Sequence, residues 1–275
     1  MDKNRPIGVF DSGVGGLTVV SALTRQLPNE EILYLGDTAR LPYGTKSKDT
    51  VTRYTRRNID FLVGRGVKAV VVACNTATAL AIEDVAVDLP LWGVVGPGAR
   101  AAAALADRGP IGVLATESTV DSGAYQRAIL ALRPAATVLA QSCPLFVPLV
   151  EEGWSEDPVA EQIARRYLEP LLEQGVRTLV LGCTHYPMLS RVIAKVAGPQ
   201  VLLVDSAETV AREVGAALAA QDLLRLDPEA PRHHFCVTDQ SPRFARIARG
   251  LLHQFRSEPV PSPVEEEITL EWVEV

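Results

Sequence analysis

ACNTATA (73–79) and GCTHYP (182–187) are the two stretches of this sequence that say most about its architecture. Each one follows a run of apolar, often β-branched residues, VKAVVVA (67–73) or VRTLVLG (176–182), and each leads into a segment with helical character. Near-continuous apolar runs are typical of parallel strands that are buried on both faces. The sequence therefore predicts two junctions of one kind, in which a buried strand ends and a helix begins.

Strand-like and helix-like runs alternate along the rest of the chain, which is typical of βα units on a parallel sheet. The first unit comprises IGVF (7–10), the glycine-rich turn DSGVGG (11–16) and the helical stretch 17–27. The other predicted strands are 31–36, 91–95, 111–115, 137–141, 202–206 and 233–238. The other predicted helices are 48–64, 76–88, 158–174, 207–221 and 242–255, and 116–130 is expected to hold a turn and a helix. We expect turns or loops at 37–44, 96–100 and 142–154.

The second half of the chain repeats the order of the first. IGVLA (111–115) corresponds to IGVF (7–10), and Cys183 corresponds to Cys74, with offsets that drift by only a few residues. Small loop insertions between two related halves produce such a drift, although any two βα arrays also look alike at this level. We predict an α/β fold with two pseudo-symmetric halves, each built on a mostly parallel sheet flanked by helices.

The composition is that of a globular protein, with 275 residues of which 47% are hydrophobic and 22% charged. A net charge of −6 and a pI of about 5.4 argue against a nucleic-acid binder that relies on positive charge. The start of the chain lacks the features of a signal peptide, and no apolar run reaches the length of a bilayer crossing. We therefore expect a cytoplasmic protein with no membrane and no nucleic-acid partner.

Four cysteines occur in the chain, and in the cytoplasm they should be free thiols. Their spacing includes no CxxC pair. The nearest candidate for a metal site comprises His233, His234 and Cys236, which have no fourth ligand nearby. We favour a plain passage from loop to strand there and expect no metal. For Cys143 and Cys236 we favour burial in the core.

Polar side chains gather at the predicted strand ends, where parallel α/β sheets open onto their ligand crevice. They are Asp11, Ser12, Asp37, Thr38, Tyr43, Cys74, Asn75, Thr76, Thr116, Ser118, Thr119, Cys143, Glu151, Cys183, Thr184 and His185. A cysteine just ahead of a helix faces free N–H groups and the positive end of the helix dipole. Both should lower the thiol pKa below its usual value of about 8.5.

Two such thiols, Cys74 and Cys183, occupy equivalent positions in the two halves. The alternative for each one is an inert core cysteine, but the polar residues that follow them have no role in core packing. A pair of thiols can remove a proton from one face of an atom and donate a proton to the other face. That is the chemistry of stereochemical inversion.

Other features leave alternatives open. GVGG (13–16) follows a strand as a phosphate loop does, but it lacks the ending of a P-loop and of GxGxxG, so we favour a tight turn close to a ligand. His185 is either an acid/base or a helix-start residue with a satisfied ring. The stretch EPVPSPVEEEITLEWVEV (258–275) is either a flexible tail or a tail with one late edge strand in its alternating end ITLEWVEV. The five lysines include none at a strand end, which disfavours a pyridoxal enzyme.

With these residues assembled, the chain resembles the glutamate racemases, a family of the cofactor-independent Asp/Glu racemase superfamily. The resemblance runs from about residue 6 to 255 and rests on IGVFDSGVGGLTV (7–19), YLGDTARLPYG (34–44), ACNTATA (73–79), GPGARAA (96–102), CPLFVPLVEEG (143–153) and GCTHYP (182–187). GCTHYP is the most specific, because related aspartate racemases carry an acid at the position of His185. Gly96 and Ser118 are small departures from the family pattern.

The resemblance implies a reaction without a cofactor. Cys74 would take the α-proton from D-glutamate and Cys183 from L-glutamate, with Asp11 assisting the first thiol and His185 the second. The residues implied to hold the substrate are Asp11, Ser12, Pro42, Tyr43, Gly44, Asn75, Thr76, Thr119, Thr184 and His185. Glu151 matches a supporting position near His185.

The resemblance also implies two domains with the active site in the cleft between them. Residues 1–97 and 208–255 would form the first domain, 98–207 the second, and 256–275 an acidic, proline-containing tail. The implied product, D-glutamate, would feed bacterial peptidoglycan synthesis and so cell wall biogenesis and cell shape, and a homodimer is expected. Rival interpretations are an aspartate or other amino-acid racemase, a hydrolase or transferase that uses one thiol, and a non-catalytic amino-acid-binding protein.

Overall fold

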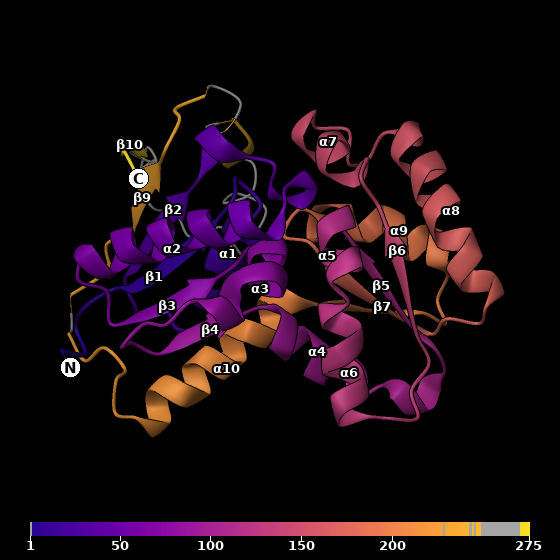
Figure 1. The fold of residues 1–275 in the computed structure, drawn as a ribbon, viewed down its shortest axis with the longest axis horizontal. Helices are drawn as coiled ribbons and strands as arrows, with labels where there is room; N and C mark the ends of the chain where they lie inside the picture. Colours follow the sequence, from indigo (N-terminus) through magenta and orange to yellow (C-terminus); the bar gives the residue numbers. More distant parts are fainter. Residues whose placement is uncertain (1, 228, 242–243, 245, 249–269) are drawn as a thin grey trace.

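The computed structural model describes residues 2–227, 229–241, 244, 246–248 and 270–275. It contains two parallel β-sheets, each flanked by helices, which form the centres of two lobes (Figure 1). The predicted α/β class with two pseudo-symmetric halves is confirmed.

Four consecutive strands of the first sheet, β2-β1-β3-β4, have the same order as the four strands of the second. The first sheet runs β10-β9-β2-β1-β3-β4 and the second runs β6-β5-β7-β8, and all paired strands are parallel. The first contains β1 (Ile7–Asp11), β2 (Ile32–Gly36), β3 (Ala69–Val72), β4 (Leu91–Gly93), β9 (His234–Val237) and β10 (Leu270–Trp272). The second contains β5 (Ile111–Ala115), β6 (Val138–Ser142), β7 (Thr178–Gly182) and β8 (Leu202–Asp205). The shared order supports the repeat predicted from sequence.

The α-helices connect the strands and cover the sheets (Figure 1). They are α1 (Leu17–Gln26), α2 (Lys48–Gly64), α3 (Asn75–Ala81), α4 (Val95–Ala103), α5 (Glu117–Ser122), α6 (Ala124–Leu132), α7 (Phe146–Glu151), α8 (Pro158–Glu173), α9 (Ser190–Ala197) and α10 (Ser206–Ala220). Side-chain oxygens begin several of them, because they accept N–H groups that the first turn leaves free. Asp157 accepts from Val159 N at 2.8 Å, and Asp205 accepts from Ala207 N at 2.8 Å.

Three local predictions were wrong. Residues 96–100 form the first part of α4 rather than a turn, because Pro97 lies in the first helical turn, where its missing N–H is not needed. The helix predicted at 76–88 ends at Ala81 and continues only as a 3-10 turn, Ile82–Asp84. The loop predicted at 142–154 contains the short helix α7.

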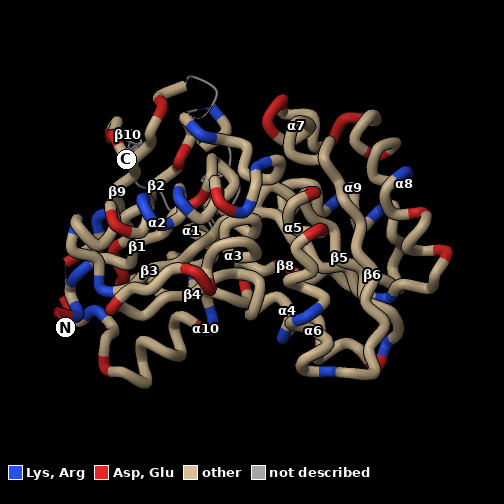
Figure 2. Tube along the Cα trace, in the orientation of Figure 1, with Lys and Arg blue, Asp and Glu red and all other residues tan. Residues whose placement is uncertain are grey.

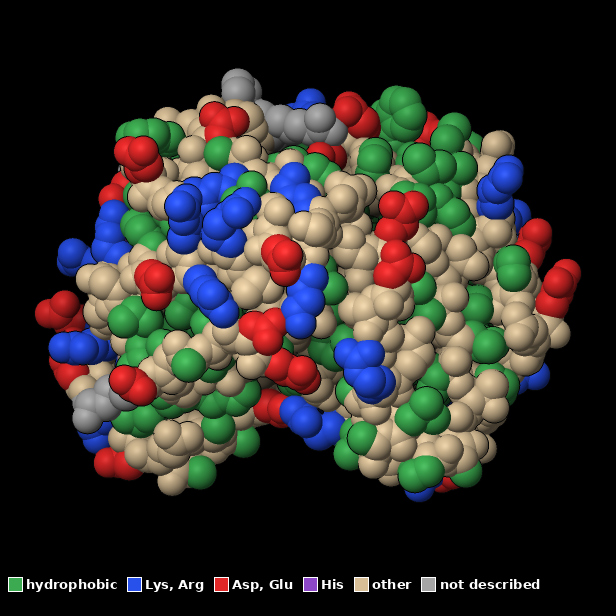
Figure 3. Space-filling model, viewed as in Figure 1, with side chains coloured by type: hydrophobic (Ala, Val, Ile, Leu, Met, Phe, Trp, Pro, Cys, Tyr) green, Lys and Arg blue, Asp and Glu red, His purple; other side chains and the backbone are tan. Residues whose placement is uncertain are grey.

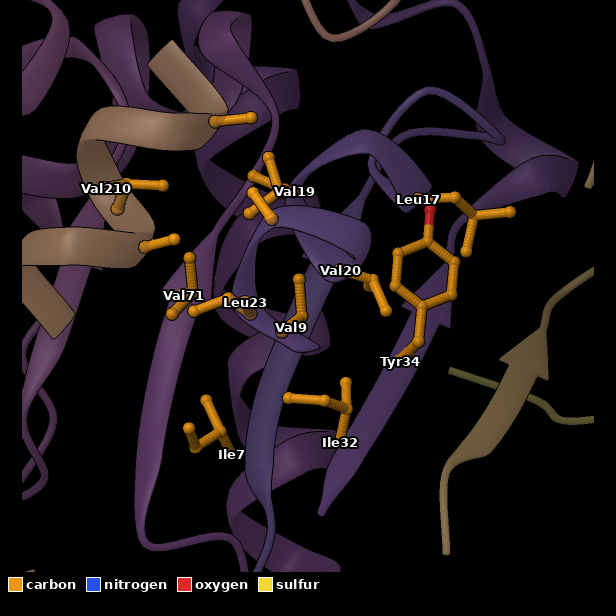
Figure 4. Close-up of a cluster of buried hydrophobic side chains, with 14 of the residues drawn as sticks. Ile7, Val9, Leu17, Val19, Val20, Leu23, Ile32, Tyr34, Val71 and Val210 are labelled. Atoms are coloured by element: carbon orange, nitrogen blue, oxygen red, sulfur yellow. The ribbon is translucent and has the colours of Figure 1, made fainter. Parts of the chain in front are cut away.

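Apolar side chains from both ends of the chain build the core on one face of the first sheet (Figure 4). Val9 of β1 and Val71 of β3 pack with Leu23 of α1 and Val210 of α10. Helix α10 follows the last strand of the second sheet, yet it packs on α1 in the first lobe. The predicted boundary at residue 97 falls inside α4, and the division into domains at that residue stays a prediction.

The last strand lies beside β9 at the edge of the first sheet (Figure 1). For residues 270–272, the edge-strand alternative is therefore the one that the structure shows. The rest of the predicted tail, 256–269, and much of the predicted helix 242–255 lie outside the described residues. Acidic and basic residues are interspersed along the chain (Figure 2), and both occur on the face shown in Figure 3. In the described part of the chain, no helix combines the length and apolar character that crossing a membrane requires.

Candidate active site

The two cysteine motifs lie at the strand ends where the strand order of each sheet reverses. In the first sheet, β1 ends at Asp11 and the adjacent β3 leads to Cys74. In the second, β5 leads to Thr116 and the adjacent β7 leads to Cys183. Ligands of open α/β sheets bind at such reversal points, outside the carboxyl ends of the strands. The fold therefore provides two equivalent candidate sites, one in each lobe.

The turn DSGVGG wraps around the carboxylate of Asp11. Its Oδ2 accepts hydrogen bonds from Gly13 N at 3.1 Å and from Gly16 N at 3.0 Å. A Cβ atom at Gly16 would lie 2.4 Å from Asp11 Cβ, so only glycine fits there. The predicted tight turn is confirmed, but its backbone donors hold a carboxylate of the chain itself.

Direct contacts bring the two strand ends together into one site. Thr184 Oγ1 donates to Asp11 Oδ1 at 3.3 Å, and Thr18 Oγ1 lies 3.3 Å from the carbonyl oxygen of Thr184. A Cβ atom at Gly15 would lie 2.4 Å from Thr184 Oγ1 and 2.6 Å from His185 Nδ1. The glycines of the first half thus allow its backbone to lie against the GCTHYP loop of the second half.

Cys74 begins helix α3 and is 5% exposed. Its Sγ accepts from Ala77 N at 3.4 Å and lies 3.8 Å from Ser12 Oγ. Burial and the charge of Asp11 raise the pKa of the thiol to about 12, although the contacts with Ala77 and Ser12 oppose this shift. The predicted lowering of the Cys74 pKa is therefore wrong, because desolvation outweighs the N-terminus of a helix with only seven residues.

Cys183 is 7% exposed, and its Sγ lies 3.9 Å from His185 Nδ1. It leads into a 3-10 turn, Tyr186–Leu189, before α9 begins, and not directly into an α-helix as predicted. His185 Nε2 lies 3.4 Å from Glu151 Oε1. Burial lowers the pKa of His185, but Cys183, Glu151 and Asp11 more than offset this and raise it to about 10. The ring is therefore a protonated imidazolium at neutral pH.

Three threonine hydroxyls form a cluster between α3 and the end of β5. Thr76 Oγ1 lies 3.0 Å from Thr116 Oγ1 and 3.2 Å from Thr119 Oγ1, and Thr116 and Thr119 are 2.9 Å apart. Next to this cluster, Asn75 Oδ1 accepts from the hydroxyl of Tyr125 at 2.7 Å. These contacts are a second set of hydrogen bonds between the two lobes.

The loop with Pro42, Tyr43 and Gly44 also meets the second lobe. The buried hydroxyl of Tyr43 donates to Asp37 and accepts from Asn58 Nδ2 at 3.1 Å, so it is satisfied within the first lobe. A Cβ atom at Gly44 would lie 2.7 Å from Cβ of Thr116, and Ser118 Oγ donates to Gly44 O at 2.8 Å. The side chain of Pro42 is exposed.

No group of three or more His, Cys, Asp or Glu side chains in the described part of the chain is placed to hold a metal ion. His234 and Cys236 lie in β9, and Cys236 Sγ lies 3.6 Å from Glu271 Oε2. The structure thus agrees with the loop-to-strand interpretation of this segment. All four cysteines are free.

Comparison with known proteins shows which family the chain belongs to. The model of the Asp/Glu/Hydantoin racemase family matches residues 7–214. A glutamate racemase of Geobacter metallireducens is 51% identical over 250 residues, which cover 90% of this chain and 93% of the relative. One of Neisseria meningitidis is 48% identical over 253 residues, with coverage of 91% and 93%. The chain belongs to the glutamate racemases.

Solved structures of glutamate racemases share the fold. The crystal structure of an isoform from Bacillus anthracis has a TM-score of 0.91 at 37% identity, covering 99% of this chain and 98% of that one. The crystal structure from Francisella tularensis in complex with D-glutamate has a TM-score of 0.88 at 36% identity, with coverage of 99% and 98%. The aspartate racemase of Picrophilus torridus shares the fold alone, with a TM-score of 0.59 at 16% identity.

Two residues that contact the candidate site were outside the substrate-binding set predicted from the sequence. Thr116 was among the strand-end groups, but only the structure shows its contact with Thr76. No sequence pattern pointed to Tyr125, because it lies inside a helix and its hydrogen-bond partner Asn75 is 50 residues away in the chain. The other predicted residues lie in the two cysteine motifs, the Asp11 turn, the 42–44 loop, α5 and α7.

Proposed function

We propose that this chain interconverts L-glutamate and D-glutamate without a cofactor, by proton transfer at the α-carbon between Cys74 and Cys183. The observation that carries this proposal is the contact of Asp11 at the Cys74 side with Thr184 at the Cys183 side, at 3.3 Å. This contact joins two equivalent strand ends into one site with a thiol on each side. The choice of glutamate as the substrate rests on relatives that are named glutamate racemases and are about 50% identical in sequence.

A two-base reaction needs one protonated thiol and one thiolate at the start. The high pKa of Cys74, about 12, keeps this thiol protonated and able to donate. Cys183, whose Sγ lies 3.9 Å from Nδ1 of the His185 imidazolium, is then the base. In this state Cys183 takes the α-proton of L-glutamate and Cys74 protonates the opposite face, which gives D-glutamate. The protonation state that results is the starting state for the reverse direction.

The carbanion-like state must be stabilised without an electron sink. Fixed hydrogen-bond donors aimed at the α-carboxylate, in a site from which water is excluded, are the available means. Candidate donors are the buried side chains of Asn75, Thr76, Thr119 and Thr184, which come from both lobes. Asp11 assists Cys74, His185 assists Cys183, and Glu151 holds His185.

The Francisella tularensis relative was solved with D-glutamate, which is the product that we propose for this chain. We place the reaction in the cytoplasm of a bacterium, where reducing conditions keep both thiols free. D-glutamate then supplies peptidoglycan synthesis, and with it cell wall biogenesis and cell shape. We expect the protein to act as a homodimer.

Proton exchange in deuterated water tests the proposal directly. The purified protein is incubated with L-glutamate and no added cofactor, while circular dichroism follows stereochemistry and proton NMR follows the α-position. We expect loss of optical activity together with deuterium at the α-carbon. Exchange of aspartate but not glutamate would favour an aspartate racemase. Binding of glutamate without any exchange would favour a non-catalytic amino-acid-binding protein.

A further inference from the structure

Asn75 has a buried amide nitrogen with no hydrogen-bond partner among the residues that the structure describes. The side chain is 2% exposed and directly follows Cys74. Its Oδ1 accepts from the Tyr125 hydroxyl at 2.7 Å, while Nδ2 makes no hydrogen bond in the structure. A buried donor without a partner is costly, since it has lost water and gained nothing in return. A donor of this kind beside a reacting group is suited to bind a ligand.

The hydrogen bonds around Tyr125 fix which end of the Asn75 amide is left free. The Tyr125 hydroxyl donates to Asn75 Oδ1 at 2.7 Å, and burial raises its pKa, so it keeps the proton that it donates. This direction leaves Nδ2 as the available end of the amide. An amide can present either oxygen or nitrogen, and only its partners decide which.

The Tyr125 ring lies in a slot between two glycines. A Cβ atom at Gly98 would lie 3.2 Å from both Cε1 and the hydroxyl oxygen, and one at Gly182 would lie 3.2 Å from Cε2. Gly182 directly precedes Cys183. Tyr125, which is 1% exposed, therefore contacts the residue after one thiol and the residue before the other.

We propose that Tyr125 is a positioning residue that orients the Asn75 amide, so that Nδ2 donates a hydrogen bond to a substrate carboxylate. This inference rests on the proposed racemisation, because it needs glutamate as the ligand. Tyr125 does not itself touch the substrate. It acts from α6 of the second lobe on a binding group of the first lobe, so it also makes that group depend on how the lobes are placed.

The Y125F variant removes the hydroxyl and keeps the ring. We expect its KM for both enantiomers to rise by about tenfold or more, the effect of losing one hydrogen bond to a charged group, with a smaller change in kcat. Y167F is the matched control, since it removes a hydroxyl that accepts from Leu145 N at 3.3 Å, away from both cysteines. It should keep the wild-type KM. A wild-type KM in folded Y125F would overturn the inference.

The Y125F substitution made in the N75A variant tests whether Tyr125 acts through the Asn75 amide. Residues that act as a unit are not additive, so Y125F should add little to the KM of N75A. A full additional loss in the double variant would overturn the inference, because it would indicate a separate structural role. If Y125F does not fold, S206A removes a hydroxyl that interacts with Tyr125, and it should raise KM in the same direction.

A readout without turnover separates this inference from the proposed function. The nitrogen–proton NMR resonances of the Asn75 side chain, identified by their loss in N75A, should shift in Y125F and not in Y167F. Absence of exchange in the wild-type protein would remove the racemase proposal. Unchanged Asn75 resonances in Y125F would overturn the positioning role, whatever the activity.

Discussion

Cys74 and Cys183 occupy equivalent strand ends but have different neighbours. Cys74 lies in the field of the Asp11 carboxylate, which adds to the effect of burial and raises the thiol pKa. Cys183 lies next to His185, whose own pKa is raised to about 10. An anionic neighbour keeps a thiol protonated. The two halves thus differ in the charged group that lies beside each cysteine.

Replacement of either thiol by serine should stop racemisation. We expect the racemisation rates of C74S and C183S each to be about 10²- to 10⁴-fold lower than that of the wild type, which is the usual contribution of a positioned acid or base. Optical activity of L-glutamate and D-glutamate measures the loss. C236A is the control, because Cys236 lies in β9 and should not take part. A variant at either strand end that keeps the wild-type rate would point to a one-thiol enzyme.

The raised pKa of His185 predicts how stability depends on pH. Below the ordinary histidine pKa of 6.5, both the folded and the unfolded state bind the proton, so the stabilisation is complete. Between 6.5 and about 10, only the folded state keeps it, and the stabilisation falls as pH rises. The difference in unfolding free energy between wild type and H185N should therefore shrink from about pH 6.5 to about pH 9.5 in urea titrations. A difference that is constant or grows would contradict the shift.

The positions of the site residues could be predicted from the sequence, whereas their protonation could not. Apolar strands followed by polar residues identify Asp11 and Cys74 as strand-end groups, because parallel strands end at one edge. The sign of the Cys74 pKa shift depends on burial by both lobes, which no local pattern contains. The pairing of Asn75 with Tyr125 likewise depends on how α3 and α6 meet.

At the scale of elements, strands were predicted more securely than helix ends. Buried parallel strands such as β3 and β7 are continuous apolar runs, and the structure places both within one or two residues of the prediction. GPGAR was misread because its glycines and proline are typical of turns, yet it packs in α4 with Ala99 and Ala102 buried. Tertiary contacts override local propensity in such cases.

Strand β10 covers the edge of the first sheet and should contribute measurably to stability. Val273 is buried against the first-lobe core, and burial of one such side chain stabilises by about 1.5–3 kcal/mol. A chain that ends at residue 269 should therefore lose about 2 kcal/mol of unfolding free energy in urea titrations. E271Q is the control, because it removes the charge that pairs with the exposed Arg65 and leaves the rest of β10 in place, and it should cost less than about 1 kcal/mol.

The same truncation should expose Cys236. Burial and Glu271 raise the pKa of this thiol to about 11, and loss of β10 removes Glu271 and uncovers the thiol. Labelling by a thiol reagent under native conditions should become faster in the truncated chain. An unchanged labelling rate together with unchanged stability would mean that β10 does not hold this edge.

At the scale of the whole molecule, the candidate site is also the junction of the two lobes. Hydrogen bonds join Thr184 to Asp11, Thr76 to Thr116, and Tyr125 to Asn75. The polar contacts that form the site therefore also hold the lobes together. Both thiols are nearly inaccessible, with exposed fractions of 5% and 7%. Substrate entry therefore requires the lobes to move apart, and bound substrate should bridge them when they close.

Glutamate should accordingly stabilise the whole molecule against unfolding. A ligand at a hundred times its Kd adds about 2.7 kcal/mol, which corresponds to a rise in Tm of about 5 °C for a chain of this size. L-glutamate and D-glutamate should give the same rise in the wild-type protein, because an active racemase converts either one into the same mixture before the scan ends. In C74S/C183S each enantiomer stays as added, so the two shifts are free to differ. An equal or larger rise with aspartate would instead favour the rival aspartate racemase, and unequal shifts for the two glutamates in the wild-type protein would mean that it does not interconvert them.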